Sequence, residues 1–291
     1  MKKRAFDIVT DSGCDLPEEY YQENGLDVVS LGFTMNNVNY GGEDGEKIAV
    51  KEFYEKLRGG AMPTTYQVTG EAAKNRIETH LKEGRDVLCV TFSSGLSGTH
   101  GSFVVAAKEL QEKYPERKIA VVDSLCASMG QGLLVDYVVK KADSGARLEE
   151  TAAYAEELKP HILHSFTVDN LFHLKRGGRV SGVTAIVGSI LKIKPVMHVD
   201  ENGKLTVVGK AMGRKKALLT MLENLFELAD IGKEDPFFIS HGDAEEEAEF
   251  VKEQILKKYP NARVTTSYIG SVIGTHAGAG TMAVFCKGKH R

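Results

Sequence analysis

The sequence predicts an α/β protein of two domains. The first is expected to be a mostly parallel sheet with helices on both faces, and the second a smaller α/β domain with a mixed sheet. In the first half, short apolar runs alternate with longer helix-period segments, which is typical of a parallel sheet covered by helices. This alternation breaks after Pro160. At 291 residues the chain also exceeds the usual size of one domain. We therefore expect domains at residues 1–162 and 163–291, with an insertion at about residues 32–62 of the first.

Three strand–helix pairs are expected in the first domain, at 5–10 with 16–24, 87–91 with 99–113, and 118–122 with 127–141. The strands end alike, in Thr10-Asp11-Ser12, Phe92-Ser93-Ser94 and Val122-Asp123-Ser124. Ligands of open α/β sheets gather at the carboxyl ends of the strands, so hydroxyls and carboxylates are expected along one edge. Taken singly, Asp11, Ser12, Asp123 and Ser124 fit helix caps better than ligand contacts.

The insertion, with its helix at 51–58, is rich in Gly, Asn and Asp and is expected to form a lid or an edge ribbon. A hydroxyl-rich loop, Pro63-Thr64-Thr65-Tyr66-Gln67, follows it and precedes a helix at 69–82 that Thr69 can cap.

The second domain is expected to begin with a strand at 161–168. Asn202-Gly203 then joins strands 196–199 and 205–208 into a hairpin. The remaining expected elements are helices at 215–228 and 245–258 and strands at 237–240, 263–269 and 281–285. The apolar stretch 183–193 is too short to span a membrane and is expected in a core or along a ligand channel.

Charge and cysteine content exclude several classes of protein. Lys and Arg number 37 against 40 Asp and Glu, so no global field favours nucleic acid or an anionic membrane. Four widely spaced cysteines and a start without an apolar signal core predict a cytoplasmic chain with free thiols, without stable membrane insertion.

The turn from Phe92 to Thr99 is the strongest ligand signal. Its small residues let the backbone come close to a ligand, and Ser93, Ser94 and Ser97 offer hydroxyls before a helix start. Unpaired N–H groups there are expected to point outward and cradle a carboxylate or a phosphate.

A second candidate is His276, in the glycine-dense stretch 273–281, which we expect to be a loop. The imidazole can be a neutral donor, a cation facing a carboxylate, or a general acid or base; a loop histidine bonded to backbone is the structural alternative. Nucleophile-elbow, dinucleotide and P-loop motifs are absent from the sequence, so no cofactor is expected. His161 and His164 are spaced to place their rings on opposite faces of a strand, so no metal site is expected.

The basic turn from Lys175 to Ser181 contains Arg176 and Arg179 around two glycines. It can hold phosphate, contact an acidic partner or carry solvated charge, and the sequence leaves these alternatives open.

In combination, these motifs resemble the DegV family. The motifs occur in the family's order over nearly the whole chain: Val9-Thr10-Asp11-Ser12 with Asp15-Leu16-Pro17, the Ser93–Thr99 turn, Val122-Asp123-Ser124, 175–181 and 274–280. The resemblance implies a bacterial protein that binds a long-chain fatty acid between two α/β domains. Members of the FakB type present the acid to a separate ATP-dependent fatty acid kinase, which makes acyl phosphate for phospholipid synthesis.

The resemblance assigns the carboxylate to Thr65, Ser94 and His276, with Ser93 and Ser97 in reserve. It also implies that Arg176 and Arg179 lie near the pocket mouth, where a kinase or its product can meet them.

This chain departs from the family at three places. Thr65-Tyr66-Gln67-Val68 replaces a common Thr-Ser-Gln-Pro, and Ala279 replaces a frequent proline. Met212 stands where FakB-type members often carry an arginine, with Arg214 as the possible substitute. If that arginine serves the kinase step, its absence leaves lipid binding unaffected, and the part of this protein in acyl-phosphate formation is open.

A lipid carrier without catalytic residues is therefore the first hypothesis. Burial of an acyl chain contributes about 0.8 kcal/mol per CH₂ before ordering costs. Ile186, Val187 and Ile190 are candidates for a tunnel wall, with an ordinary buried helix as the alternative, and Phe33 is a candidate for a lid. The second hypothesis is an acyl- or phosphoryl-group hydrolase or transferase, with His276 as base and Ser94 or Ser97 as nucleophile. Nucleic-acid binding through Arg176 and Arg179 is the weakest hypothesis. The sequence does not predict the chain length of the fatty acid.

Overall fold

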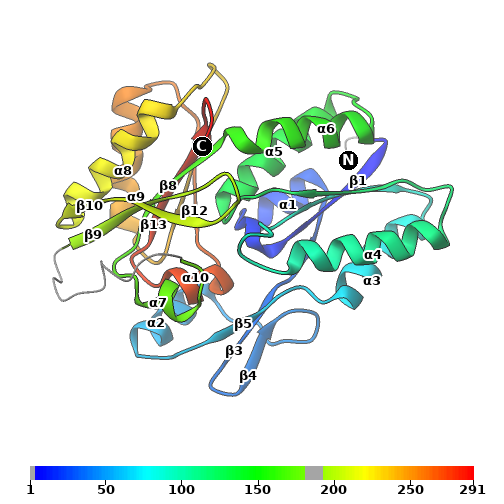
Figure 1. Ribbon diagram of the computed structural model, residues 1–291, viewed down its shortest axis with the longest axis horizontal. Helices are drawn as coiled ribbons and strands as arrows, with labels where there is room; N and C mark the ends of the chain where they lie inside the picture. Colours follow the sequence, from blue (N-terminus) through cyan, green and yellow to red (C-terminus); the bar gives the residue numbers. More distant parts are fainter. Residues whose placement is uncertain (1–3, 181–192) are drawn as a thin grey trace.

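The computed structural model describes residues 4–180 and 193–291. Two larger sheets, each covered by helices, form its two domains, and the insertion adds a small third sheet (Figure 1). The N-terminal sheet has the strand order β2-β1-β6-β7, and all its neighbouring strands are parallel. Its elements are β1 (Phe6–Asp11), the 3₁₀ turn η1 (Ser12–Cys14), α1 (Glu18–Asn24), β2 (Leu26–Val29), α3 (Gly70–Lys82), β6 (Asp86–Thr91), α4 (Thr99–Lys113), β7 (Ile119–Asp123), α5 (Met129–Asp143) and α6 (Leu148–Leu158).

Alternate residues of the N-terminal strands pack against different helices, because side chains of a strand point to opposite faces in turn. Val9 and Cys89 share a cluster with residues of α3 and α4, such as Ile77. Ile8 and Leu88 belong to the cluster on the other face, which contains α5 and α6. Both faces are therefore covered, as the sequence predicts.

The C-terminal sheet is mixed, with the order β10-β9-β8-β13-β11-β12. Only the pair β11–β12 is parallel, and the other pairs are antiparallel. Its elements are the 3₁₀ turn η2 (Lys159–His161), β8 (Ile162–Thr167), α7 (Phe172–Arg176), β9 (Ile193–Val199), β10 (Leu205–Met212), α8 (Arg214–Leu228), β11 (Phe237–His241), α9 (Glu245–Lys258), β12 (Val264–Tyr268), α10 (Ser271–Ala277) and β13 (Met282–Lys287). The predicted hairpin is β9–β10, and the predicted helices and strands of this half are present with small shifts at their ends.

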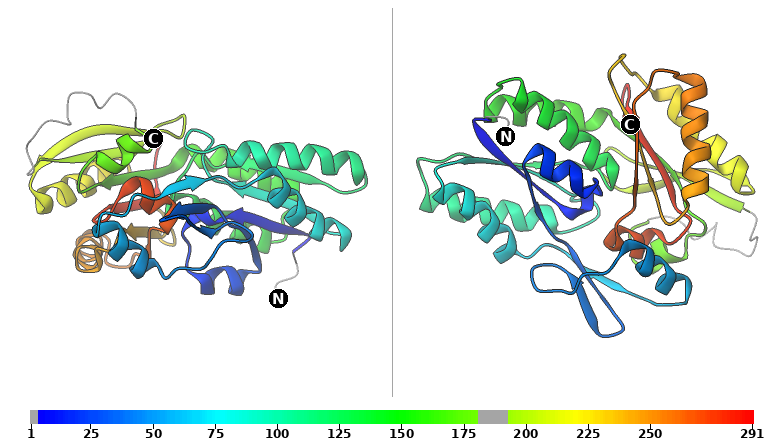
Figure 2. Two further views of the ribbon diagram at one scale, coloured as in Figure 1. Left: turned by 90° about the horizontal axis from the view of Figure 1, so that it is seen from below. Right: turned by 180° about the vertical axis from the view of Figure 1, so that it is seen from behind.

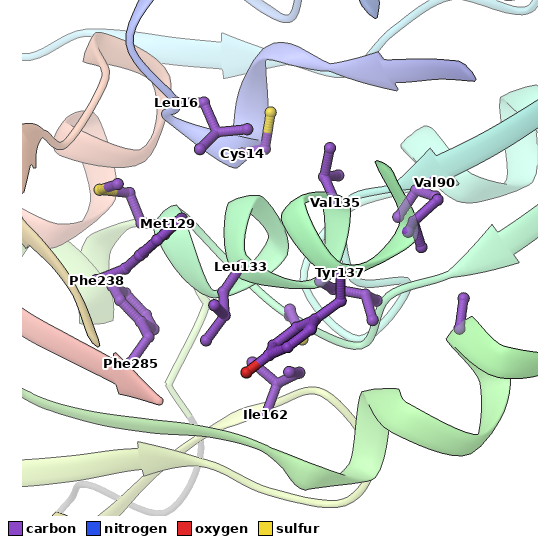
Figure 3. Close-up of a cluster of buried hydrophobic side chains, with 14 of the residues drawn as sticks. Cys14, Leu16, Val90, Met129, Leu133, Val135, Tyr137, Ile162, Phe238 and Phe285 are labelled. Carbon is purple, nitrogen blue, oxygen red and sulfur yellow. The ribbon is translucent and has the colours of Figure 1, made fainter. Parts of the chain in front are cut away.

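One face of the C-terminal sheet packs on its own helices and the other faces the N-terminal domain. Residues of α8 and α9 cluster with Phe237 and Ile239. Phe238 and Phe285 point the other way, into a cluster that contains Met129 and Leu133 of α5 (Figure 3). Helix α5 thus joins the two domains into one continuous apolar core.

The insertion forms a small antiparallel sheet rather than a loose lid. Strands β3 (Gly32–Met35), β4 (Val38–Gly41) and β5 (Thr64–Tyr66) pair in the order β4-β3-β5, and α2 (Val50–Arg58) lies between β4 and β5 in sequence. Helix α2 packs against α10 of the C-terminal domain, as the views in Figures 1 and 2 show. The insertion therefore places β5 beside the second domain.

The prediction of a loop around His276 is wrong at its start, because residues 271–277 form the helix α10. Gly274 lies inside this helix, where a Cβ would overlap the Tyr54 hydroxyl at 2.6 Å and the Phe53 ring at 2.9 Å. Gly278, with φ +84°, ends it. The glycines that suggest a loop serve close packing and helix termination instead.

No described helix is both long and apolar enough to cross a membrane.

Two carboxyl groups, those of Asp11 and Asp15, are buried near the domain junction. Burial raises the pKa of Asp11 from 3.8 to about 6 and that of Asp15 from 3.8 to about 7, although hydrogen bonds to both groups oppose the shift. The folded chain then holds these protons more tightly than the unfolded chain. Stability on account of these groups is full at low pH and falls as pH rises through about 4 to about 7.

We predict that Asp15→Asn flattens this fall, because the amide cannot ionise. In urea unfolding at about pH 4.5 and about pH 7.5, the wild type should lose on the order of 2–4 kcal/mol more than the variant. Equal losses in the two proteins would show that Asp15 does not titrate in this range.

Candidate functional site

A cavity of about 380 Å³ lies between the two domains, and most of its lining is apolar. Its apolar lining residues include Leu31, Phe92, Leu96 and Ala127 from the N-terminal domain and Phe166, Leu174, Val199, Leu205, Ile269, Val272, Ile273, Ala277, Ala283 and Phe285 from the C-terminal domain. Neither domain alone encloses the space. The polar lining side chains are Thr65, Tyr66, Gln67, Ser97, Ser128, His164, Arg179, His276 and Thr281.

Thr65 and His276 meet across the domain junction. Thr65 lies on β5 and His276 near the end of α10, and their Oγ1 and Nε2 atoms are 2.8 Å apart. Helix α10 reaches this place because it contacts α7, α2, β3 and β5. The structure thus brings together two residues that the resemblance assigns to the carboxylate, 211 positions apart in sequence.

His276 is neutral near pH 7. Burial, followed by the nearby charges of Arg179 and Arg176, lowers its pKa from 6.5 to about 4. Nδ1 is buried and has no hydrogen-bond partner among the described residues. A buried N–H without a partner is costly, so we assign the proton to Nε2, which faces Thr65. The imidazole is then a neutral hydrogen-bond donor.

Two glycines allow this close arrangement. A Cβ at Gly177, which follows α7, would overlap the His276 imidazole, and a Cβ at Gly98 would overlap the Gln67 amide. Gln67 follows β5, and its Nε2 donates to Ser102 Oγ at 3.1 Å. A larger residue at Gly177 would displace the half-buried His276 ring, whereas one at Gly98 would displace only the end of the exposed Gln67 side chain.

The Ser93–Thr99 turn does not present a cradle of free backbone N–H groups. The N–H groups of residues 93 to 97 all donate within the protein, to Cys126 O, Asp123 Oδ1, Ser93 Oγ and, twice, Ser93 O. This expectation is therefore wrong, because the turn is stabilised by its own donors. The Thr99 N–H also donates, to Ser97 Oγ at 3.2 Å, so side chains of the turn rather than its backbone remain to meet a ligand.

The three serines of the turn have different surroundings. Ser93 is buried and donates to Gly203 O at 2.8 Å. Ser94 is exposed and is not among the described residues that line the cavity. Ser97 does line it, with Oγ 3.0 Å from Thr99 Oγ1. Among the described residues, Ser97 is the one serine of the turn that lines the cavity, whose lining also contains Thr65 and His276.

The predicted arginines also differ. Arg179 lines the cavity and donates from Nε to Leu96 O at 3.2 Å, and Arg176 Nη2 donates to Thr275 O at 3.4 Å. Arg214 instead forms an ion pair with Glu247, with Nε 2.9 Å from Oε2, and also donates to Gly280 O. Arg214 is held in place, while the Met212 side chain is 58% exposed.

Of the tunnel candidates, Phe33 is buried elsewhere. It packs with Tyr40 and Phe53 in the cluster between the insertion and α10 and is not among the described lining residues. Ile186, Val187 and Ile190 lie outside the described residues.

Sequence reasoning missed the wall formed by β8 and β13, with Phe166 and Phe285. The usual signal is alternation of apolar and polar residues, but the burial of both faces of this sheet leaves no such alternation in β8, where every residue is buried. His164, next to this wall, accepts the Ala127 N–H at 3.2 Å and donates from Nδ1 to Ile162 O at 2.9 Å.

The arrangement is suited to binding rather than to nucleophilic catalysis. With its proton on Nε2, His276 donates to Thr65 and cannot take the proton of the Thr65 hydroxyl, and the only hydroxyl partner of Ser97 among the described residues is Thr99. A nucleophile paired with a base is the signature that catalysis would require. The cavity joins a mostly apolar wall to neutral donors and one arginine, which suits an amphipathic anion.

Comparison with known proteins agrees with this geometry. Residues 5–289 match the model of the DegV family of uncharacterised proteins. A DegV domain-containing protein of Clostridium perfringens is 42% identical over 99% of this chain and 98% of its own length. A Thermus thermophilus structure described as showing fatty acid binding of a DegV family protein is 30% identical, covering 99% of this chain and 100% of its own, with a TM-score of 0.88. DegV of Bacillus subtilis, described as a fatty acid binding protein, is also 30% identical with the same coverage and a TM-score of 0.83.

These solved relatives are described as binding proteins, and their similarity covers both domains and the junction between them. The chain belongs to the DegV family.

Proposed function

We propose that this protein binds one long-chain fatty acid in the cavity between its domains. The carboxylate is held by Thr65, Ser97 and His276 beside Arg179, and the acyl chain lies along the apolar wall. The observation that carries the proposal is the 2.8 Å Thr65–His276 contact on the wall of a mostly apolar interdomain cavity. Fatty acid binding by the Thermus thermophilus and Bacillus subtilis relatives supports the ligand class.

Different parts of the cavity lining bind the acyl chain and the carboxylate of the fatty acid. Apolar burial contributes about 0.8 kcal/mol for each CH₂ that leaves water. A carboxylate taken from water needs hydrogen bonds and a nearby opposite charge. The hydroxyls and the neutral His276 provide the first, and Arg179 provides the second. The tail therefore supplies affinity, and the head group sets the orientation.

We also propose, from the family resemblance, that the bound acid is presented in the cytoplasm to a fatty acid kinase, which forms acyl phosphate for phospholipid synthesis. Arg176 and Arg179, both exposed side chains next to the head-group residues, support this step. Arg214 is paired with Glu247 and donates to Gly280 O, so we give the kinase contact to Arg176 and Arg179 rather than to Arg214.

Protein purified from a bacterial host should contain fatty acid. Solvent extraction and mass spectrometry are expected to find long-chain acid at near-equimolar amounts, and delipidated protein should bind palmitate saturably. A protein that carries no fatty acid and binds no palmitate would refute the proposal.

Substitutions of single hydroxyl residues should show which serine, Ser97 or Ser94, contacts the carboxylate. Thr65→Val and Ser97→Ala each remove a hydroxyl at nearly constant volume, and each should weaken palmitate binding by about 5- to 10-fold, the effect of one hydrogen bond. Ser94→Ala is the matched control and should stay within about twofold. Palmitate affinity is measured by fluorescence displacement. A larger loss of affinity in Ser94→Ala than in Ser97→Ala would show that Ser94, and not Ser97, contacts the carboxylate.

The kinase step is testable with a bacterial fatty acid kinase, ATP and the palmitate-loaded protein. Acyl phosphate, trapped as hydroxamate, should form, and Arg179→Gln should lower the rate by about tenfold or more through loss of a charge-assisted contact. Absence of product with wild-type protein would limit the function to lipid binding, as would a kinase that turns over free palmitate equally well.

A further inference from the structure

The segment from Asp11 to Asp15 contacts three parts of the cavity wall without lining the cavity itself. Asp11 Oδ2 accepts the Phe92 N–H at 2.7 Å, and Ser12 Oγ accepts the Leu31 N–H at 2.9 Å. Both donors belong to residues that line the cavity. The proposed function gives these side chains no role, although they fix the positions of residues that do have one.

Asp15 differs from the other two because it reaches across the domain junction. Its Oδ1 accepts the N–H of Gly270, the residue before α10, at 3.0 Å. Its Oδ2 accepts the hydroxyl proton of Ser128 at 2.5 Å, and Ser128 Oγ lies 2.9 Å from Ser240 Oγ of β11, whose hydroxyl can donate to it. One buried carboxylate thus joins η1, the start of α5 and two parts of the C-terminal domain.

The backbone at Asp15 directs the carboxylate to this place. Its φ is +50°, in the left-handed region where Asp and Asn are tolerated better than most residues. The side chain is buried, so its oxygen atoms depend on protein donors.

Hydrogen bonds fix the residues just before α10, and the last turn of this helix carries the site residue His276. Besides the Gly270 contact, Tyr54 of α2 donates to Ile269 O at 2.9 Å. The first turn of α10 puts Val272 and Ile273 on the cavity wall, and its last turn carries His276. Because a helix this short moves as one unit, a shift at Gly270 also shifts His276 relative to Thr65.

We infer that Asp15 is a positioning residue of the ligand site. Asp15, in the N-terminal domain, accepts the Gly270 N–H and so fixes α10 in the position in which His276 contacts Thr65 Oγ1. The inference rests on the proposed function only for the identity of the ligand, because the Asp15–Gly270 and Thr65–His276 contacts exist without it.

Two substitutions separate the carboxylate contact from backbone strain. Asp15→Gly tolerates φ +50° and removes the acceptor. Asp15→Asn tolerates the same φ and keeps an acceptor for the Gly270 N–H. Its amide can donate to Ser128 Oγ, and the Ser128 hydroxyl can then donate to Ser240 Oγ. Circular dichroism establishes that each variant is folded.

The first measurement is the ¹H–¹⁵N imidazole spectrum of His276 in the ligand-free protein, assigned by its loss in His276→Ala. The signal should shift in Asp15→Gly and return to the wild-type position in Asp15→Asn. An unchanged His276 signal in Asp15→Gly overturns the inference, whether or not the protein binds fatty acid. If Asp15→Gly does not fold, Asp15→Ala, which also removes the acceptor of the Gly270 N–H, should shift the same signal, and an unchanged signal again overturns the inference.

The second measurement is palmitate affinity in a double-mutant cycle. Asp15→Gly should weaken binding about tenfold in the wild type but less than about twofold in the His276→Ala background, and Asp15→Asn should stay within about twofold. Equal losses in both backgrounds mean that Asp15 acts through general stability, which overturns the inference. Failure of the wild type to bind palmitate refutes the proposed function, and the imidazole spectrum then decides the role of Asp15 by itself.

Discussion

The hydrogen bond between Thr65 and His276 is the contact on which the rest of the site depends. Its two residues come from an inserted strand of the first domain and a short helix of the second. It exists only while the domains are in contact, as does the apolar cavity beside it. The shared core around α5, the packing of α2 on α10 and the buried acid Asp15 all hold the two halves at this separation (Figures 1 and 3).

The protonation state of His276 also follows from the contact between the two domains, which buries its imidazole. Burial and two arginines keep the imidazole neutral, so the site offers donors without placing a cation in the buried part of the site. Neutral donors inside and a cation at the exposed Arg179 suit a ligand whose charge lies at one end of an apolar chain. Asp15, whose pKa is raised to about 7 by burial, lies at the opposite end of α10 from His276, where it contacts the Gly270 N–H and Ser128.

Much of the fold follows from sequence periodicity, because the apolar pattern of the strand–helix pairs is set by burial on one helix face or on both strand faces. The carboxylate candidates Thr65 and His276 follow from motif resemblance. The choice among Ser93, Ser94 and Ser97 depends on the direction of a tight turn, which three neighbouring serines do not reveal. The glycines around His276 suggest a loop, yet Gly274 is required by the rings of α2. The contact from Asp15 to Gly270 spans 255 positions and has no local signature.

A crystal structure of the protein loaded with palmitate labelled with bromine at the terminal carbon would test the central claim most directly. We predict that the carboxylate oxygens lie within hydrogen-bond distance of Thr65 Oγ1, Ser97 Oγ and His276 Nε2, with the bromine among the apolar side chains between the domains. A bromine beside Thr65 and His276, or a ligand bound outside the interdomain cavity, would contradict the account.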